Sequence, residues 1–156
     1  MFYIKMSLQS DLSKLLEIDL FLDRIMRQFK ISRDYLGILD VPLNECVKNA
    51  IVHGNKSDRN KKVNIEVHRE KSELLFSITD EGQGFDYDTF LRQGIEQRDV
   101  NGLSLVEMLT NDLSFSKDGS QVCYKVSIPH SSAENNERID VLQQCQDAVK
   151  SAQLKI

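Results

Sequence analysis

Two short blocks of sequence, separated by about two dozen residues, constrain this chain more than any other feature. Residues 44–55 read Asn-Glu-Cys-Val-Lys-Asn-Ala-Ile-Val-His-Gly-Asn, and residues 80–86 read Asp-Glu-Gly-Gln-Gly-Phe-Asp. In the first block, Glu45 and Asn49 are four residues apart, which places a carboxylate and a carboxamide one turn apart on a helix. In the second block, a hydrophobic strand runs into a glycine-rich turn that begins with Asp80. The fold must therefore accommodate an amphipathic helix and a strand that ends in a charged turn.

Apolar periodicity along the rest of the chain predicts a helix-and-sheet fold. Alternating apolar and polar residues predict five strands, at 2–8, 63–67, 74–78, 113–116 and 122–128. Apolar residues at three- and four-residue steps predict three helices, at 11–29, from about 42 to 53, and from 103 to about 109. We expect Asp11 to cap the first helix, Pro42 to lie in the first turn of the second, and Gly54 to end it. The predicted class is α+β, a two-layer α/β sandwich with a mixed, mostly antiparallel sheet and helices on one face.

The remaining segments are less regular. Residues 87–101 are polar and show no firm period, so a mobile loop is predicted there. Residues 129–136 form a polar linker, and an amphipathic helix is predicted from about residue 137. We expect residues 1–130 to form one domain, followed at 131–156 by the linker and the C-terminal helix. That helix either packs on its own domain or mediates dimerisation.

Composition narrows the class of protein. A chain of 156 residues with 40% hydrophobic and 28% charged residues is typical of one soluble globular domain. The net charge of −4 argues against direct nucleic-acid binding. The three cysteines are widely spaced and odd in number, which suits reduced thiols better than disulfides or a zinc site. No segment is apolar enough for a signal peptide or a membrane span. We therefore expect a cytoplasmic protein with no membrane or nucleic-acid partner.

The first block contains a candidate general base and a candidate metal ligand. On a helical wheel its apolar side chains gather on one side, and Glu45 and Asn49 point outward on the other. A carboxylate and an amide suit a general base and a hard cation such as Mg²⁺, which takes further ligands from phosphates. The simpler explanation is a solvated helix face.

The second block suits contact with a base. Asp80 at the strand end can accept a hydrogen bond from an exocyclic amine, which distinguishes adenine from guanine. Gly82 and Gly84 permit a backbone approach that a Cβ would obstruct. A tight turn is the simpler explanation here, but the two blocks in this order favour a site for a magnesium-bound nucleotide.

Together the blocks resemble the N-box and first glycine box of the Bergerat-fold ATPases, a superfamily that includes histidine kinases, type II topoisomerases and mismatch-repair proteins. Within it, residues 49–55 and 80–86 are most similar to the anti-sigma-factor serine kinases of bacterial partner-switching systems. The resemblance extends from about residue 11 to residue 128. It implies the Bergerat fold, with ATP and Mg²⁺ as cofactors.

The resemblance also implies a role for each matching residue. Glu45 is expected to be the general base, Asn49 the Mg²⁺ ligand and Asp80 the adenine contact. The other expected nucleotide-binding residues are two glycines beside the adenine, two residues of the second glycine box beside the phosphates, and a serine near the base: Gly82, Gly84, Gly102, Leu103 and Ser120.

The implied function is that of an ATP-binding protein serine kinase that acts as an anti-sigma factor in transcription regulation. Its expected partners are an anti-sigma-factor antagonist, which it phosphorylates on serine, and a sigma factor; a homodimer is also expected. The second glycine box departs from the family, because Val100 stands where a glycine is usual before Asn101-Gly102-Leu103. This departure favours an alternative, a binding module that sequesters a partner with weak or no kinase activity. A third, weaker alternative is a detached ATPase domain of a histidine-kinase-like pathway.

Overall fold

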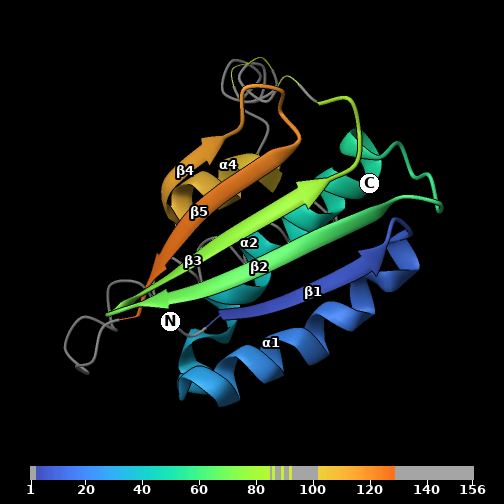
Figure 1. Cartoon of the computed structure of the whole chain (residues 1–156). Coiled ribbons are helices and arrows are strands. Elements are labelled where there is room, and N and C mark those ends of the chain that lie inside the picture. The colour runs from blue at the N-terminus through green and yellow to red at the C-terminus, as the bar shows by residue number, and fades with distance from the viewer. Residues whose placement is uncertain (1–2, 85, 87–88, 90–91, 93–101, 129–156) are drawn as a thin grey trace, which may run out of the picture.

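The computed structural model describes residues 3–84, 86, 89, 92 and 102–128. Its centre is a five-stranded sheet in the order β1-β2-β3-β5-β4 (Figure 1). The strands are β1 (Tyr3–Gln9), β2 (Lys62–Glu70), β3 (Glu73–Asp80), β4 (Asn111–Phe115) and β5 (Gln121–Ser127). All four pairings are antiparallel, so over these strands the sheet is antiparallel throughout rather than mixed.

Strand register places the apolar residues on one face of the sheet. Val67 pairs with Phe76, which pairs in turn with Tyr124, and all three side chains are buried. The rings of Phe76 and Tyr124 stack with their centroids 4.9 Å apart. Residues at the alternate positions are exposed or half-buried, and there Gln121 donates hydrogen bonds to the hydroxyls of Ser77 and Thr79. The alternation expected of a sheet covered on one face is therefore present.

Helices cover the apolar face, which confirms the predicted two-layer sandwich. They are α1 (Leu16–Phe29), α2 (Leu36–Asn49) and α4 (Gly102–Leu109). Shorter turns adjoin them: 3₁₀ turns η1 (Leu12–Leu15) and η2 (Arg33–Tyr35), and a π-helical turn η3 (Ala50–Gly54) that continues α2. The core joins buried residues of α1, α2 and the strands. No helix among the described residues is long and apolar enough to cross a membrane.

The start of the second helix was predicted wrongly. Pro42 lies in the interior of α2, which begins at Leu36, rather than in its first turn. Proline has no N–H, so the carbonyl of Ile38 lacks the usual helical hydrogen bond from residue 42. Ile38, Leu39 and the Pro42 ring are all buried. Burial of this apolar face outweighs the unfavourable helix propensity of proline.

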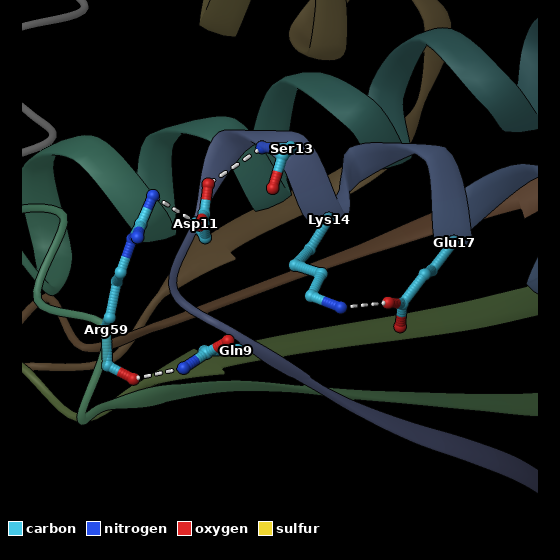
Figure 2. A network of polar contacts seen from close by, with 6 residues as sticks. All are labelled: Gln9, Asp11, Ser13, Lys14, Glu17 and Arg59. Carbon is cyan, nitrogen blue, oxygen red and sulfur yellow. Dashed lines mark hydrogen bonds and ion pairs between the residues drawn. The ribbon is translucent and has the colours of Figure 1, made fainter.

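A polar network fixes the start of the helical layer, as Figure 2 shows. Asp11 caps η1 as predicted, because its carboxylate accepts a hydrogen bond from the backbone N–H of Ser13 at 3.0 Å. The same carboxylate pairs with the guanidinium of Arg59 at 2.9 Å, and the carbonyl of Arg59 accepts from the Gln9 amide at 2.9 Å. The loop between η3 and β2 is thereby attached to the end of β1.

Three predictions from the sequence fall on other parts of the chain. The predicted loop at 87–101 lies outside the described residues except at residues 89 and 92. The linker from residue 129 and the C-terminal helix also lie outside them, and so does the departure at Val100 and Asn101.

Candidate functional site

The first part of the candidate site lies where α2 meets α4. Glu45 is half-buried, and a Cβ added to Gly102 would overlap its carboxylate. The Glu45 carboxylate therefore lies directly against the first residue of α4. A helix N-terminus presents free N–H groups and a positive dipole end, which favour anionic groups such as phosphates. Leu103 is fully buried and anchors this first turn.

Asn49 is the last residue of α2, one turn beyond Glu45. It is expected to point outward from the apolar side of the helix, and in the structure it is 8% exposed, so it is covered rather than solvated. Its amide nitrogen is buried and has no hydrogen-bond partner among the described residues. A buried amide without a partner is unfavourable by about 1–3 kcal/mol, and a ligand would provide the missing contact.

The second part of the site lies at the end of β3. Asp80 is the last residue of the strand and is 5% exposed. Its Oδ1 accepts a hydrogen bond from the N–H of Gly82 at 2.8 Å. Burial raises the pKa of this carboxyl; the Gly82 bond opposes the shift, Asp118 adds to it, and Lys61 opposes it. Asp80 is therefore a desolvated acceptor at a strand end, as a contact to an exocyclic amine requires.

Glycines let three pieces of backbone meet around Asp80. A Cβ on Gly54 would overlap the Asp80 carboxylate, and a Cβ on Gly82 would overlap the carbonyl of Gly54. Gly84 has a φ of +95°, and a Cβ there would overlap the carbonyl of Asp118 in the turn between β4 and β5. The predicted glycines Gly82 and Gly84 thus lie at close backbone approaches, where side chains do not fit.

Ser120 directly precedes β5, the strand that neighbours β3, and it lies beside Asp80. Its carbonyl accepts the N–H of Asp80 at 2.9 Å, and its hydroxyl donates to Asp118 at 2.8 Å. Hydrogen bonds from Ser116 and Ser120 lower the pKa of Asp118 to about 2. The structure therefore brings Ser120 next to the predicted base contact, with its hydroxyl engaged within its own turn.

One continuous helical segment, α2 followed by η3, connects the two parts of the site. Asn49 ends α2, and η3 then carries the chain through five residues to Gly54, which touches Asp80. Single π-helical turns occur frequently at functional sites. The sequence pattern predicts only a helix stop at Gly54. The contacts of Gly54 and Asn55 with Asp80 and Glu81 join residues 26 positions apart, and a pattern confined to one helix does not reveal such pairs.

No three His, Cys, Asp or Glu side chains gather as a metal cluster in the described part of the chain. A divalent cation would depend on the Asn49 amide together with phosphate oxygens and water, an arrangement that suits Mg²⁺. The buried Nδ2 of Asn49 can only donate, so it suits a phosphate oxygen of such a group, while the side-chain oxygen would be the ligand for the cation.

Comparison with known proteins bears directly on this geometry. The profile of the histidine kinase-like ATPase domain family matches residues 8–126, well over half of the chain. The matched stretch includes Glu45, Asn49, Asp80 and Gly102. A comparison with curated proteins gives no significant match. Membership of the family implies ATP as the nucleotide, and on the strength of the profile match this chain belongs to the histidine kinase-like ATPase domain family.

Proposed function

We propose that this protein is an ATP-dependent serine kinase that acts as an anti-sigma factor and phosphorylates an antagonist protein. The observation that carries the proposal is the contact of the Glu45 carboxylate with the first residue of α4. In that position a carboxylate stands beside a helix N-terminus suited to phosphate groups. One turn further along α2 lies the side-chain amide of Asn49, whose nitrogen is buried without a hydrogen-bond partner among the described residues.

Each of these residues has a distinct task in the proposed reaction. Glu45 accepts the proton of the substrate serine as the serine oxygen attacks the γ-phosphorus of ATP. The bond from that phosphorus to the β–γ bridging oxygen breaks, and ADP leaves. Asn49 would hold Mg²⁺ through its side-chain oxygen, and Asp80 would accept a hydrogen bond from the adenine amine. Bound Mg²⁺ supplies neutralisation of the charge on the phosphates.

An apolar surface supports the expectation of protein partners. Leu12, Leu16 and Leu20 follow one another at four-residue steps on η1 and α1, and they are 47%, 76% and 72% exposed. Leu16 and Leu20 lie one turn apart on α1, and exposed apolar side chains that gather on one face often mark a protein interaction site. We propose the antagonist protein, a sigma factor and a second copy of this chain as the partners.

ATP binding is the first test of the proposal. Calorimetric titration of the full chain with ATP and Mg²⁺ is expected to show magnesium-dependent binding, which Asn49→Ala weakens by at least tenfold. Glu45→Ala is expected to bind ATP normally and to abolish transfer. Proteins captured by the tagged chain are then incubated with ATP, and phosphoserine is mapped by mass spectrometry. Phosphoserine that persists with Glu45→Ala would contradict the general-base role.

A second candidate is a binding module that sequesters its partner without phosphorylating it. Val100 favours this candidate, because a β-branched residue adopts unusual backbone angles poorly where the related kinases have glycine. The same assay separates the two candidates. A captured partner that remains unphosphorylated in the presence of ATP supports the binding module, and phosphoserine on the partner supports the kinase.

A further inference from the structure

Asn55, the residue directly after η3, is fully buried and uses both ends of its side-chain amide. Its Oδ1 accepts the backbone N–H of Glu81 at 2.8 Å, and its Nδ2 donates to the carbonyl of Lys62 at 2.9 Å. Because one partner can only donate and the other can only accept, these bonds fix the orientation of the amide.

These bonds extend the sheet beyond its backbone ladder. The register of β2 and β3 ends at the pair Val63 and Asp80. One residue further, the Glu81 carboxylate accepts the N–H of Lys62 at 2.5 Å, while Asn55 bridges the Lys62 carbonyl and the Glu81 N–H. Side chains thus provide the last rung between the two strands, at the position where the chain turns away after Asp80.

Asparagine is needed at position 55 for its side-chain amide. Its tolerance for left-handed backbone plays no part. Asparagine after a helix end often adopts positive φ, but here φ is −84°. The neighbouring residue, Gly54, touches both the Asp80 carboxylate and the Gly82 turn. Any movement of Asn55 relative to Glu81 would therefore change the separation between η3 and the Asp80 turn.

We propose that Asn55 is a positioning residue for recognition of the nucleotide base. It holds η3 and the Asp80–Gly82 turn at the separation that aims the Asp80 carboxylate, without itself touching the ligand. The inference rests on the ATP site described under the proposed function, and it concerns the base end of that site. Phosphate contacts near Asn49 and Gly102 are independent of it.

The test compares two ligands on the full-length chain. ATP depends on both ends of the site, whereas inorganic tripolyphosphate engages only the phosphate end. One net hydrogen bond contributes about 1 kcal/mol, or about fivefold in affinity. Asn55→Asp keeps the acceptor for Glu81 but replaces the donor to Lys62 with a carboxylate oxygen that repels the carbonyl, so ATP affinity is expected to fall at least fivefold. Asn55→Ala loses both bonds, and a loss of at least tenfold is expected. Tripolyphosphate affinity should stay within twofold of wild type in both variants.

A remote core variant controls for loss of stability. Leu22→Ala removes a buried side chain in α1, and it is expected to lower the melting temperature while leaving ATP affinity in the folded protein unchanged. The proposal is overturned if the Asn55 variants lose ATP and tripolyphosphate affinity equally, or bind ATP as the Leu22→Ala control does. Wild type that fails to bind ATP would instead refute the proposed function.

A measurement on the wild type needs no variant to fold. Hydrogen exchange followed by NMR should show the Glu81 amide proton as protected as those of the β2–β3 ladder, since Asn55 accepts it in a buried position. Rapid exchange of this proton in the folded protein would overturn the proposal, because the bond that is supposed to set the separation would then be absent.

Discussion

At the scale of single residues, stability and ligand recognition make opposite demands on the carboxyl group of Asp80. Its pKa is raised by burial, so the folded protein binds the Asp80 proton more tightly than the unfolded chain does. That stabilising effect is complete below the unfolded pKa of about 3.9 and is lost as pH rises through the folded pKa. In its ionised form Asp80 is a desolvated acceptor, in a position where a ligand amine would bind it.

The variant Asp80→Asn separates these two demands. At pH 7 its melting temperature should exceed that of wild type, because the desolvated charge is gone, and the difference should shrink as pH approaches 4. Its ATP affinity should fall about 10- to 100-fold, as expected for a lost hydrogen bond to a charged group at about 1.5–3 kcal/mol. Calorimetric melting at several pH values and ATP titration check both expectations.

Asp118→Asn is the matched control, with the opposite sign. The pKa of Asp118 is lowered to about 2 by hydrogen bonds from Ser116 and Ser120. Its contribution is therefore present above the unfolded pKa of about 3.9 and is lost as pH falls toward 2. Asp118→Asn should melt below wild type at pH 7 and close to it near pH 2. Equal shifts in both variants would contradict this electrostatic account.

Gly102→Ala tests the contact between α4 and the proposed base. The new Cβ would displace the Glu45 carboxylate, whose flexible end can move at little cost in stability. Because small misplacements of a catalytic group can cost about 100-fold in rate, we expect phosphotransfer to fall by at least tenfold while the melting temperature stays within a few degrees. Kinetic assay and thermal melting of the same preparation provide the measurement. Unchanged turnover would show that the carboxylate does not act from this position.

The sequence pattern singles out candidate site residues but not the residues that contact them. Glu45 and Asn49 stand out because they lie one turn apart on a predicted amphipathic helix. Asp80 stands out because it is a charged residue at the end of an apolar strand. Such a pattern does not predict that Gly54 lies close to Asp80 or that Asn55 forms its hydrogen bonds. Both arise only when the sheet closes, through contacts between residues far apart in the chain.

At the scale of elements, α1 has one buried and one exposed face. Leu20 and Leu22 lie on different faces, and their exposed fractions differ accordingly. Leu20 is 72% exposed and Leu22 is 1% exposed. Leu22→Ala should lower the free energy of unfolding by about 2–5 kcal/mol, whereas Leu20→Ala should change it by less than about 0.5 kcal/mol. Urea denaturation of both variants gives the comparison. A large loss for Leu20→Ala would mean that this side chain is covered in the folded protein.

The strands were predictable because their signal is local. Apolar residues recur at every second position from Val63 to Val67 in β2 and from Leu74 to Ile78 in β3, and both strands extend only a few residues beyond these predicted limits. The beginning of α2 was not predictable from the same kind of signal, since Pro42 by itself indicates a helix start. Burial of Ile38 and Leu39 in the core explains why the helix begins earlier.

At the scale of the whole molecule, the family profile and the sheet end at nearly the same residue. The profile match ends at residue 126, and the last described backbone bond, from Ile128 to Ser72, follows β5 directly. A shortened chain of residues 1–130 is therefore expected to melt within a few degrees of the full chain and to bind ATP equally well. Side-by-side melting curves and ATP titrations test this. Loss of folding would assign residues 131–156 a place in the core.

The π-helical turn also has a consequence for how this chain tolerates insertions and deletions. Each residue of an α-helix rotates the chain by about 100°, and each residue of a π-helical turn by somewhat less, so removal of one residue from η3 would turn Asn55 away from Glu81 and move Gly54 away from Asp80. The loop from 56 to 61 has no comparable constraint from helical phase. Among descendants of this sequence η3 should therefore keep its five residues, and any change of length in the loop should preserve the contacts of Arg59 with Asp11 and Gln9.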